Sequence, residues 1–457
     1  MQDGRPGSLI FREVEWVPPG GAEPQVGDVR VEDGVIVALG AVDAGFGASR
    51  TECVDGRGLT LLPGVIDPQV HFREPGLTHK EDLATGSESA AAGGVTAFLE
   101  MPNTSPPTTD AAALRAKHAA AQGRCRAHWG FFFGATPSNA GAVERPDIAP
   151  LACGLKIFMG SSTGTLLVDQ QDALEGHFAA TRTVPIAVHA EDEARLKALK
   201  AATAPGTARV QDHPRLRDET AAVMATERAI ELARRHGRRL HILHLSTAEE
   251  VEVLRRVRAE GAPPGLITAE TLPQYLYLDT RDYDRLGTRA QMNPPVRDAR
   301  HGAALWRGLL DGTLDCLATD HAPHTLEEKA RPYGEAPSGM PGVETLLPLM
   351  LHAVSLGRCT LPQIVAWLCE GPARCYGLAG KGRLAVGFDG DVVLVDRRAR
   401  RTLSDSQMHT RCAWTPYAGW TLAGTVQMTV LRGTPVFRDG RFAPGVFGQP
   451  LTFARVT

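Results

Sequence analysis

The central part of the chain alternates short apolar runs with Ala-rich stretches of helical character, a pattern typical of repeated β-α units. One helical stretch, 218–237, ends in a glycine where a C-cap is expected. Eight strand candidates lie at 64–72, 94–102, 128–134, 154–160, 185–190, 239–246, 265–272 and 314–322. Eight such units predict an α/β fold of the TIM-type (β/α)8 class. An open doubly wound sheet is the alternative, but no Gly-x-Gly-x-x-Gly turn follows the first strand.

The two ends of the chain have a different sequence pattern, which is rich in strand-like alternation and Asp-Gly turns. The Glu-Asp-Gly turn at 32–34 predicts a hairpin, and the segments at 382–396 and 424–442 are similar in kind. We expect both ends to meet as one small β-sandwich module. The predicted domains are 1–60 for the N-terminal part of this module, 61–377 for the (β/α)8 barrel, and 378–457 for the C-terminal part of the module.

The composition excludes several classes of partner. A formal net charge of −3 gives no reason to expect nucleic acid, and no apolar run approaches the roughly 20 residues of a membrane span. The first residues lack the pattern of a secretory signal. The eight cysteines form no Cys-x-x-Cys pair, which favours reduced and mostly buried thiols. We therefore expect a cytoplasmic protein.

Residues that can do chemistry gather at the ends of the predicted strands. They are His71, Arg73, Asn103, Lys156, His189, His244 and Asp320. Each has a structural alternative, because a single strand histidine is more often structural, a lysine can snorkel and an aspartate can cap a helix. In a barrel, however, the carboxyl ends of all strands face one opening, where active sites of this fold are built. Their joint occurrence therefore favours a functional site.

The residue types in this set indicate a metal centre. Imidazoles with a carboxylate suit an ion such as Zn²⁺, which lowers the pKa of bound water towards ~7. Lys156 does not fit as an ammonium, because its charge would repel the metal. A neutral lysine can add CO₂ to form an anionic carbamate that bridges two metals, and burial favours the neutral amine.

With these residues assembled, the chain resembles the dihydroorotases of the amidohydrolase superfamily from about residue 61 to residue 377. The motifs that carry the resemblance are "DPQVHFREPGLTHKED", "GGVTAFLEMPNTSPPT", "GLKIFMGSSTG", "VHAED", "HILHLST", "QMNPPVR", "ATDHAPHT" and "SGMPGVET", in this order. The resemblance implies a hydrolase of cyclic amide C–N bonds. It would cyclise N-carbamoyl-L-aspartate reversibly to L-dihydroorotate in pyrimidine biosynthesis.

The resemblance also implies a role for each site residue. The metal ligands would be His71, a CO₂-derived carbamate on Lys156, His189, His244 and Asp320, holding one or two zinc ions per chain. Asp320 would also be catalytic, as the proton shuttle between a metal-bound hydroxide and the leaving ring nitrogen. The substrate-binding residues would be Arg73, Asn103 and His324 at the free carboxylate, and Asn293 elsewhere on the substrate.

One residue departs from the common pattern of these enzymes. Many dihydroorotases have His-x-His where this chain has Gln69-Val70-His71. An amide oxygen is a weaker zinc ligand than imidazole, so the position built from His71 and Asp320 should be weakened. The position built from His189 and His244 is unchanged. We expect one tightly held zinc and a second that is weaker or absent.

Two other functions stay open at this point. A hydantoinase- or allantoinase-like enzyme would share the barrel and metals, but its ring substrates lack the carboxylate that Arg73 would clamp. A non-catalytic homologue could instead serve as a structural partner of aspartate carbamoyltransferase, yet only Gln69 deviates among the ligands. An active enzyme could also form a homodimer or associate with that transferase. The segment "TLEEK" (325–329) is most simply a solvated helix start.

Overall fold

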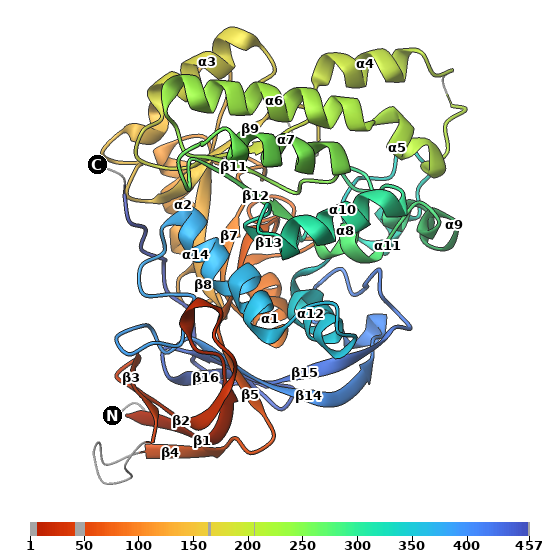
Figure 1. The fold of residues 1–457 in the computed structure, drawn as a ribbon. Coiled ribbons are helices and arrows are strands. Elements are labelled where there is room, and N and C mark those ends of the chain that lie inside the picture. Colours follow the sequence, from red (N-terminus) through yellow and green to blue (C-terminus); the bar gives the residue numbers. More distant parts are fainter. Residues whose placement is uncertain (1–6, 42–50, 163–165, 205, 456–457) are drawn as a thin grey trace.

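The eight predicted strand runs form one parallel sheet in the computed structural model, which describes residues 7–41, 51–162, 166–204 and 206–455 (Figure 1). Each strand is parallel to the next, in the order β13-β12-β11-β10-β9-β8-β7-β6. The strands are β6 (Val65–Val70), β7 (Val95–Glu100), β8 (His128–Gly134), β9 (Ala152–Phe158), β10 (Ile186–His189), β11 (Leu240–Ile242), β12 (Ile267–Thr271) and β13 (Cys316–Leu317). All lie inside the predicted runs except β9, which begins two residues before its run, at Ala152.

Contacts between β6 and the segment after β13 close this sheet into a barrel. Val70 forms a parallel bridge with His321, and the backbone N–H of His71 donates to the carbonyl oxygen of His321 over 2.7 Å. The side chain of Asp67 accepts a further hydrogen bond from the N–H of Thr319 over 3.1 Å. The predicted barrel is thereby confirmed. Its closure also places the segments that carry His71 and Asp320 side by side.

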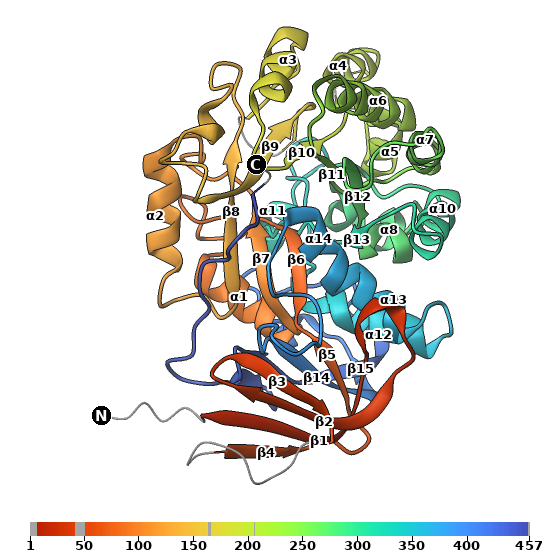
Figure 2. The same ribbon diagram turned by 60° about the vertical axis from the view of Figure 1, so that its left-hand side comes forward.

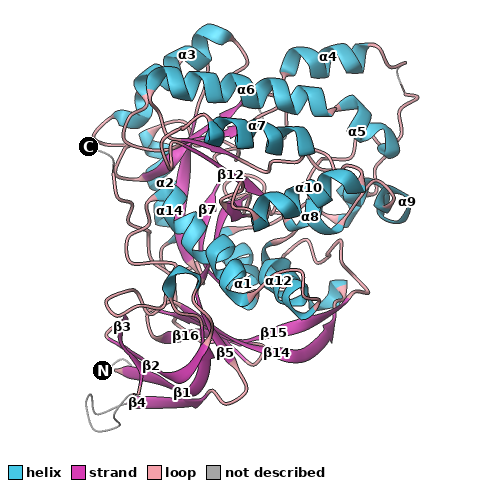
Figure 3. Ribbon diagram, in the orientation of Figure 1, coloured by secondary structure: helices cyan, strands magenta, loops and turns pink. Residues whose placement is uncertain are grey.

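Helices connect the strands and cover the outside of the barrel (Figures 2 and 3). The α-helices are α1 (Leu83–Ala92), α2 (Ala111–Ala121), α3 (Gln171–Ala180), α4 (Glu193–Ala201), α5 (His213–Leu216), α6 (Glu219–His236), α7 (Ala248–Ala259), α8 (Pro273–Tyr277), α9 (Asp282–Leu286), α10 (Ala299–Leu310), α11 (Leu326–Lys329), α12 (Leu346–Ser355), α13 (Leu361–Val365) and α14 (Gly371–Tyr376). In α6, the side chain of Asp218 caps the first turn and Gly237 ends the helix at φ 61°. This left-handed conformation suits glycine, and the predicted C-cap is confirmed.

Strands from both chain ends form a second, mixed sheet below the barrel (Figure 1). Its order is β17-β16-β15-β14-β5-β1-β2-β3, with β4 beside β1. The strands are β1 (Ser8–Trp16), β2 (Gln25–Glu32), β3 (Val35–Gly40), β4 (Thr51–Asp55), β5 (Thr60–Pro63), β14 (Val392–Thr402), β15 (Thr421–Leu431), β16 (Thr434–Arg438) and β17 (Arg441–Phe442). The predicted hairpin is present, because Glu32 pairs with Val35 across the turn. We retain 1–60, 61–377 and 378–457 as proposed domain limits.

The strand β5 joins the two ends of the chain, because it pairs with β1 on one side and β14 on the other. It runs directly into β6, the first strand of the barrel. The expectation that the chain ends meet in one β-module is therefore confirmed. This module packs on the barrel through α12, which contacts β15.

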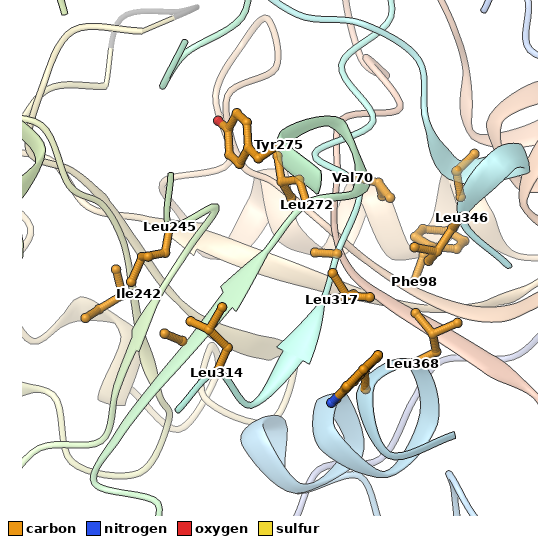
Figure 4. Packing of buried hydrophobic residues seen from close by; sticks show 14 of the residues in the cluster. Val70, Phe98, Ile242, Leu245, Leu272, Tyr275, Leu314, Leu317, Leu346 and Leu368 are labelled. Carbon is orange, nitrogen blue, oxygen red and sulfur yellow. The ribbon is translucent and has the colours of Figure 1, made fainter. Parts of the chain in front are cut away.

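Apolar side chains fill the space between the barrel strands and the helices. Figure 4 shows Phe98 and Leu317 of the strands in one buried cluster with Leu346 of α12 and Leu368. A smaller cluster, which includes Leu99 and other strand residues, fills the barrel interior. Such a filled interior leaves only the strand ends open to chemistry.

Two further predictions concern the chain as a whole. All eight cysteines are free thiols, and all but Cys53 are buried, as the sequence predicted. In the described ranges, no helix has the length and apolar character needed to cross a membrane.

Candidate active site

The predicted site residues come together at the carboxyl end of the barrel. His71 and Arg73 follow β6, Asn103 follows β7, Lys156 lies in β9, His189 ends β10, His244 follows β11, and Asp320 and His324 follow β13. All eight of these side chains are buried. Asn293 lies in the segment after η4 (Gly287–Ala290) and is half-buried. Residues separated by up to about 250 positions therefore line one region, as the barrel geometry predicts.

Two ring nitrogens and a carboxylate define the first part of the site. His71 Nε2 lies 2.9 Å from Asp320 Oδ1, and His71 Nδ1 lies 2.8 Å from Asn103 Oδ1. The side-chain amide of Gln69 donates to the same Asp320 oxygen over 3.1 Å. Gln69 and His71 thus point to one place, as residues two apart on a strand should. The other amide atom, Gln69 Oε1, is buried without a hydrogen-bond partner.

Two further imidazoles define the second part. His189 Nδ1 lies 3.0 Å from His244 Nε2. Burial lowers the pKa of His189, and it holds the pKa of His244 well below its usual value together with the charges of His189, Lys156 and His71. Both rings are therefore neutral at pH 7. Neutral imidazole is the form that ligates metals.

Lys156 lies close to both parts of the site. Its charge contributes to the lowered pKa values of His71, His189 and His244. The Lys156 side chain is 1% exposed, its Nζ has no hydrogen-bond partner, and it lies 4.4 Å from the centre of the Phe158 ring. Burial lowers the pKa of this amine to about 7. An ammonium with no partner is costly to bury, so the neutral amine is favoured.

The backbone is strained at three positions of the site. Arg73, His244 and Asp320 adopt φ values of 65°, 37° and 45°, in the left-handed region that disfavours residues with a side chain. Each such residue costs of order 1–3 kcal/mol, and such outliers cluster at functional sites. The three strained residues come from three different segments: Arg73 follows β6, His244 follows β11 and Asp320 follows β13.

The donor set fits a zinc-type ion. His189 and His244 would hold one ion, while His71 and Asp320 would contribute to a second position. A carbamate on Lys156 would replace its unpartnered amine by an anion close to both. The unpartnered atoms Lys156 Nζ and Gln69 Oε1 are the observations that support this fit, because buried polar atoms normally have partners.

Arg73 and His324 form a cationic corner beside this cluster. Arg73 Nε donates to the Pro323 carbonyl oxygen over 3.2 Å, and Arg73 Nη2 lies 3.2 Å from His324 Nε2. No carboxylate of the described residues lies within salt-bridge distance of the Arg73 guanidinium. Burial lowers the pKa of Arg73 to about 10. A buried arginine without a carboxylate partner is unusual, because buried charges are normally paired.

Lys80 from a loop and Glu328 from α11 complete this corner. Lys80 Nζ lies 3.0 Å from both His324 Nδ1 and Glu328 Oε1. Because an ammonium only donates, His324 Nδ1 accepts from Lys80, and the ring hydrogen on Nε2 is donated to the Ser338 carbonyl oxygen over 3.0 Å. Glu328 and the buried Lys329 belong to "TLEEK", so the prediction that this segment is a solvated helix start was wrong at these two positions. The helix turns inward because Glu328 pairs with Lys80, and Lys329 Nζ donates to the carbonyl oxygens of Gln291 and Pro337.

Asn293 contacts a histidine that sequence reasoning did not single out. Its Oδ1 lies 3.0 Å from His213 Nε2, and His213 Nδ1 lies 2.9 Å from the Tyr333 hydroxyl. Burial lowers the pKa of His213 to about 4. The structure thus holds Asn293 through α5 rather than through the metal cluster.

A sequence profile of the amidohydrolase family matches residues 60–436. The chain belongs to the amidohydrolase family. It is 40% identical over 431 residues to a dihydroorotase of Halobacterium salinarum, covering 92% of this chain and 95% of that relative. It is also 38% identical over 438 residues to an allantoinase of Rubrobacter xylanophilus, covering 94% of both.

Solved structures agree with this assignment. An L-hydantoinase (dihydropyrimidinase) from Arthrobacter aurescens superimposes with a TM-score of 0.90 at 32% identity, over 97% of this chain and 99% of that one. The fold of this amidohydrolase, a barrel-like parallel sheet with a mixed sheet from both chain ends, is therefore shared with the hydantoinase.

Several site-proximal residues of this amidohydrolase escaped sequence reasoning. Lys80 comes from a loop, Glu328 from the short helix α11, and Arg217 from the segment between α5 and α6, and no periodicity marks a function at any of them. Glu191 had one signal, since it stands two residues after His189 and alternation along an extended segment places such residues on one side.

Proposed function

We propose that the protein is a hydrolase of cyclic amides and, specifically, a zinc-dependent dihydroorotase. It would interconvert N-carbamoyl-L-aspartate with L-dihydroorotate plus water in pyrimidine biosynthesis. The observation that carries the finer proposal is the buried Arg73 guanidinium without a carboxylate partner among the described residues. A substrate that brings its own carboxylate would supply the missing anion.

A substrate carboxylate would compensate the charge of the buried Arg73 guanidinium. A guanidinium taken out of water needs an anion and hydrogen-bond acceptors around its five N–H groups. A planar carboxylate meets both needs through two parallel hydrogen bonds. Dihydroorotate and N-carbamoyl-L-aspartate carry this group, whereas hydantoin and allantoin rings do not. A substrate of the latter kind would leave Arg73 buried and unpaired in the complex.

The remaining residues have roles that follow from their contacts. Arg73, Asn103 and His324 would bind the carboxylate and orient the ring, with Asn293 as a further contact. One or two zinc ions, with His71, His189, His244, Asp320 and the Lys156 carbamate as the ligand set, would supply Lewis acidity and lower the pKa of water. Asp320 would take a proton from the attacking water and deliver it to the ring nitrogen that leaves. The reverse reaction uses the same transfer in the opposite order.

An allantoinase is the second candidate, because the Rubrobacter xylanophilus allantoinase is nearly as similar as the dihydroorotases. The Arg73 environment argues against it. A non-catalytic homologue is disfavoured for another reason. All five predicted metal ligands are present and buried, and only Gln69 departs from the common ligand pattern. Association with aspartate carbamoyltransferase, or as a homodimer, stays a prediction.

Parallel assays test the proposal. The zinc-loaded protein, purified with bicarbonate present, is offered dihydroorotate, N-carbamoyl-L-aspartate, hydantoin and allantoin. We expect turnover of the first two in opposite directions and at least a hundredfold lower kcat/KM for the others. Turnover of hydantoin or allantoin alone would overturn the dihydroorotase assignment. Zinc binding without any turnover would favour the structural homologue.

A further inference from the structure

A buried carboxylate lies directly behind one of the converging imidazoles. Glu191 stands two residues beyond the end of β10, and its side chain is fully buried. Its Oε2 lies 2.8 Å from His189 Nε2. The other ring nitrogen of His189, Nδ1, faces His244. Glu191 therefore touches His189 on the side away from the proposed metal.

Arg217 clamps this carboxylate with two nitrogens. Its Nε lies 3.1 Å from Glu191 Oε1, and its Nη2 forms a second, short contact with Oε2. The guanidinium pairs with both carboxylate oxygens, an arrangement that stabilises the ionised carboxylate. Glu191 is thus an anion with no proton to donate, so it can only accept a hydrogen bond from His189.

This contact determines the tautomer of His189. If Nε2 donates to Glu191, the hydrogen of the neutral ring lies on Nε2 and the lone pair lies on Nδ1. The lone pair then points to the place where His244 Nε2 also points, 3.0 Å away. A carboxylate behind a metal-binding histidine fixes both ring orientation and tautomer in this way.

Arg217 is itself held from other parts of the barrel. Its Nη2 donates to the Ser161 carbonyl oxygen over 2.7 Å, in the segment after β9. Its own carbonyl oxygen accepts from Arg297 Nη1 over 3.0 Å, and Arg297 Nε donates to Ser246 Oγ over 3.1 Å. These contacts tie Arg217 to the segments that follow β9 and β11. Lys156 lies in β9, and His244 follows β11.

We propose that Glu191 and Arg217 act as a pair of positioning residues that hold His189 with Nδ1 free for the metal. The pair touches no substrate and acts only through His189. This inference rests on the metal site of the proposed function. It adds which residues set the geometry of the zinc position built from His189 and His244. The alternative is an ion pair that only stabilises the fold.

Glu191→Gln is the decisive variant because it keeps the shape and removes the charge. Arg217 would attract the amide oxygen, which turns the amide N–H₂ towards His189 Nε2. That nitrogen would then have to accept, moving the ring hydrogen to Nδ1 and blocking ligation. We expect a 10- to 100-fold loss of zinc affinity, the range seen for such partners, measured by competition with a fluorescent chelator in bicarbonate buffer.

The neighbouring pair Arg195–Asp218 provides a matched control. Arg195 Nε lies 2.7 Å from Asp218 Oδ1, so this is also an arginine–carboxylate pair, but it touches no ring of the site. Asp218→Asn keeps a good N-cap for α6, and it should bind zinc as the parent does. ¹⁵N spectra of histidine-labelled, metal-free protein give a second readout, because Glu191→Gln should exchange the protonated and bare nitrogens of His189.

Arg217→Lys keeps the fold testable if Glu191→Gln fails to fold, since it retains a cation beside Glu191. We expect a smaller, several-fold loss of zinc affinity, with a double variant no worse than Glu191→Gln alone. Folded Glu191→Gln or Arg217→Lys protein that binds zinc within twofold of the parent overturns the proposal, and so do additive effects. Zinc affinity is measured without substrate. A parent that fails to turn over dihydroorotate while Glu191→Gln loses zinc would therefore refute only the proposed function.

Discussion

The side-chain amide of Gln69 donates a hydrogen bond to Asp320 Oδ1 over 3.1 Å. The same oxygen lies 2.9 Å from His71 Nε2. Gln69 therefore offers its nitrogen, not its oxygen, to the carboxylate that a second metal would need. A metal at this position has to displace a hydrogen bond as well as accept a weak amide ligand. This relationship gives a structural reason for unequal zinc positions.

Gln69→His should equalise the two zinc positions. An imidazole at this residue adds a strong nitrogen ligand beside His71 and removes the amide donor from Asp320. We expect about one zinc per chain to resist dialysis in the parent and about two in the variant, as measured by plasma mass spectrometry. Gln69→Ala, which removes the donor without adding a ligand, should stay near one. Two equally resistant zinc ions in the parent would contradict the expectation.

Lys156→Ala should remove both metal and activity. The variant lacks the amine that forms the carbamate, so it lacks the anion that would serve both metal positions. Short-chain carboxylates such as acetate or propionate should restore part of the zinc content and of the turnover, because they can replace the two carbamate oxygens. Chloride at the same ionic strength should restore neither. Normal rates in the unrescued variant would exclude the bridging role.

The local parts of this fold were predictable from the sequence, whereas the parts made by tertiary closure were not. Each barrel strand is a short apolar run, so its type, and the strand-end position of His71 or His244, could be inferred directly. Lys80 reaches His324 across 244 positions, and nothing in its neighbourhood signals that contact. Glu328 looked solvated because a capped, charged helix start is usually exposed. Its pairing with Lys80, a residue distant in the sequence, turns it inward.

The pH dependence of stability should report the buried amine of Lys156. Its pKa falls from 10.5 to about 7 on folding, chiefly through burial. Between these values the unfolded chain binds a proton that the folded chain lacks, so this residue makes stability rise with pH. In metal-free, bicarbonate-free protein, Lys156→Met should raise the free energy of unfolding most at and below pH 7. The margin should shrink by about 1.4 kcal/mol per pH unit towards pH 10.

Urea unfolding of the parent and Lys156→Met proteins at several pH values measures this margin. The comparison removes the contributions of other titrating groups, including Lys329, whose pKa is also lowered to about 7 by burial. Lys197→Met, at an exposed lysine, should show no such trend. A margin that stays constant between pH 7 and pH 10 would mean that Lys156 keeps its charge in the folded protein.

Arg73→Gln tests whether the site binds a substrate that carries a carboxylate. The variant loses the charge and the fork that would hold the substrate carboxylate, while the metal ligands keep their contacts. Hydrogen bonds to charged groups contribute about 1.5–3 kcal/mol each, so losing two should lower kcat/KM for dihydroorotate by roughly 150-fold or more. Arg73→Lys should fall in between, because a lysine keeps the charge without the bidentate geometry.

Zinc content should be unchanged in both variants, which separates a binding defect from a damaged metal centre. The exposed Arg281, paired with Asp279 on the surface, provides a control through Arg281→Gln. If Arg73→Gln hydrolysed dihydroorotate as well as the parent, the carboxylate would have to bind elsewhere, and the unpaired guanidinium would need another anion.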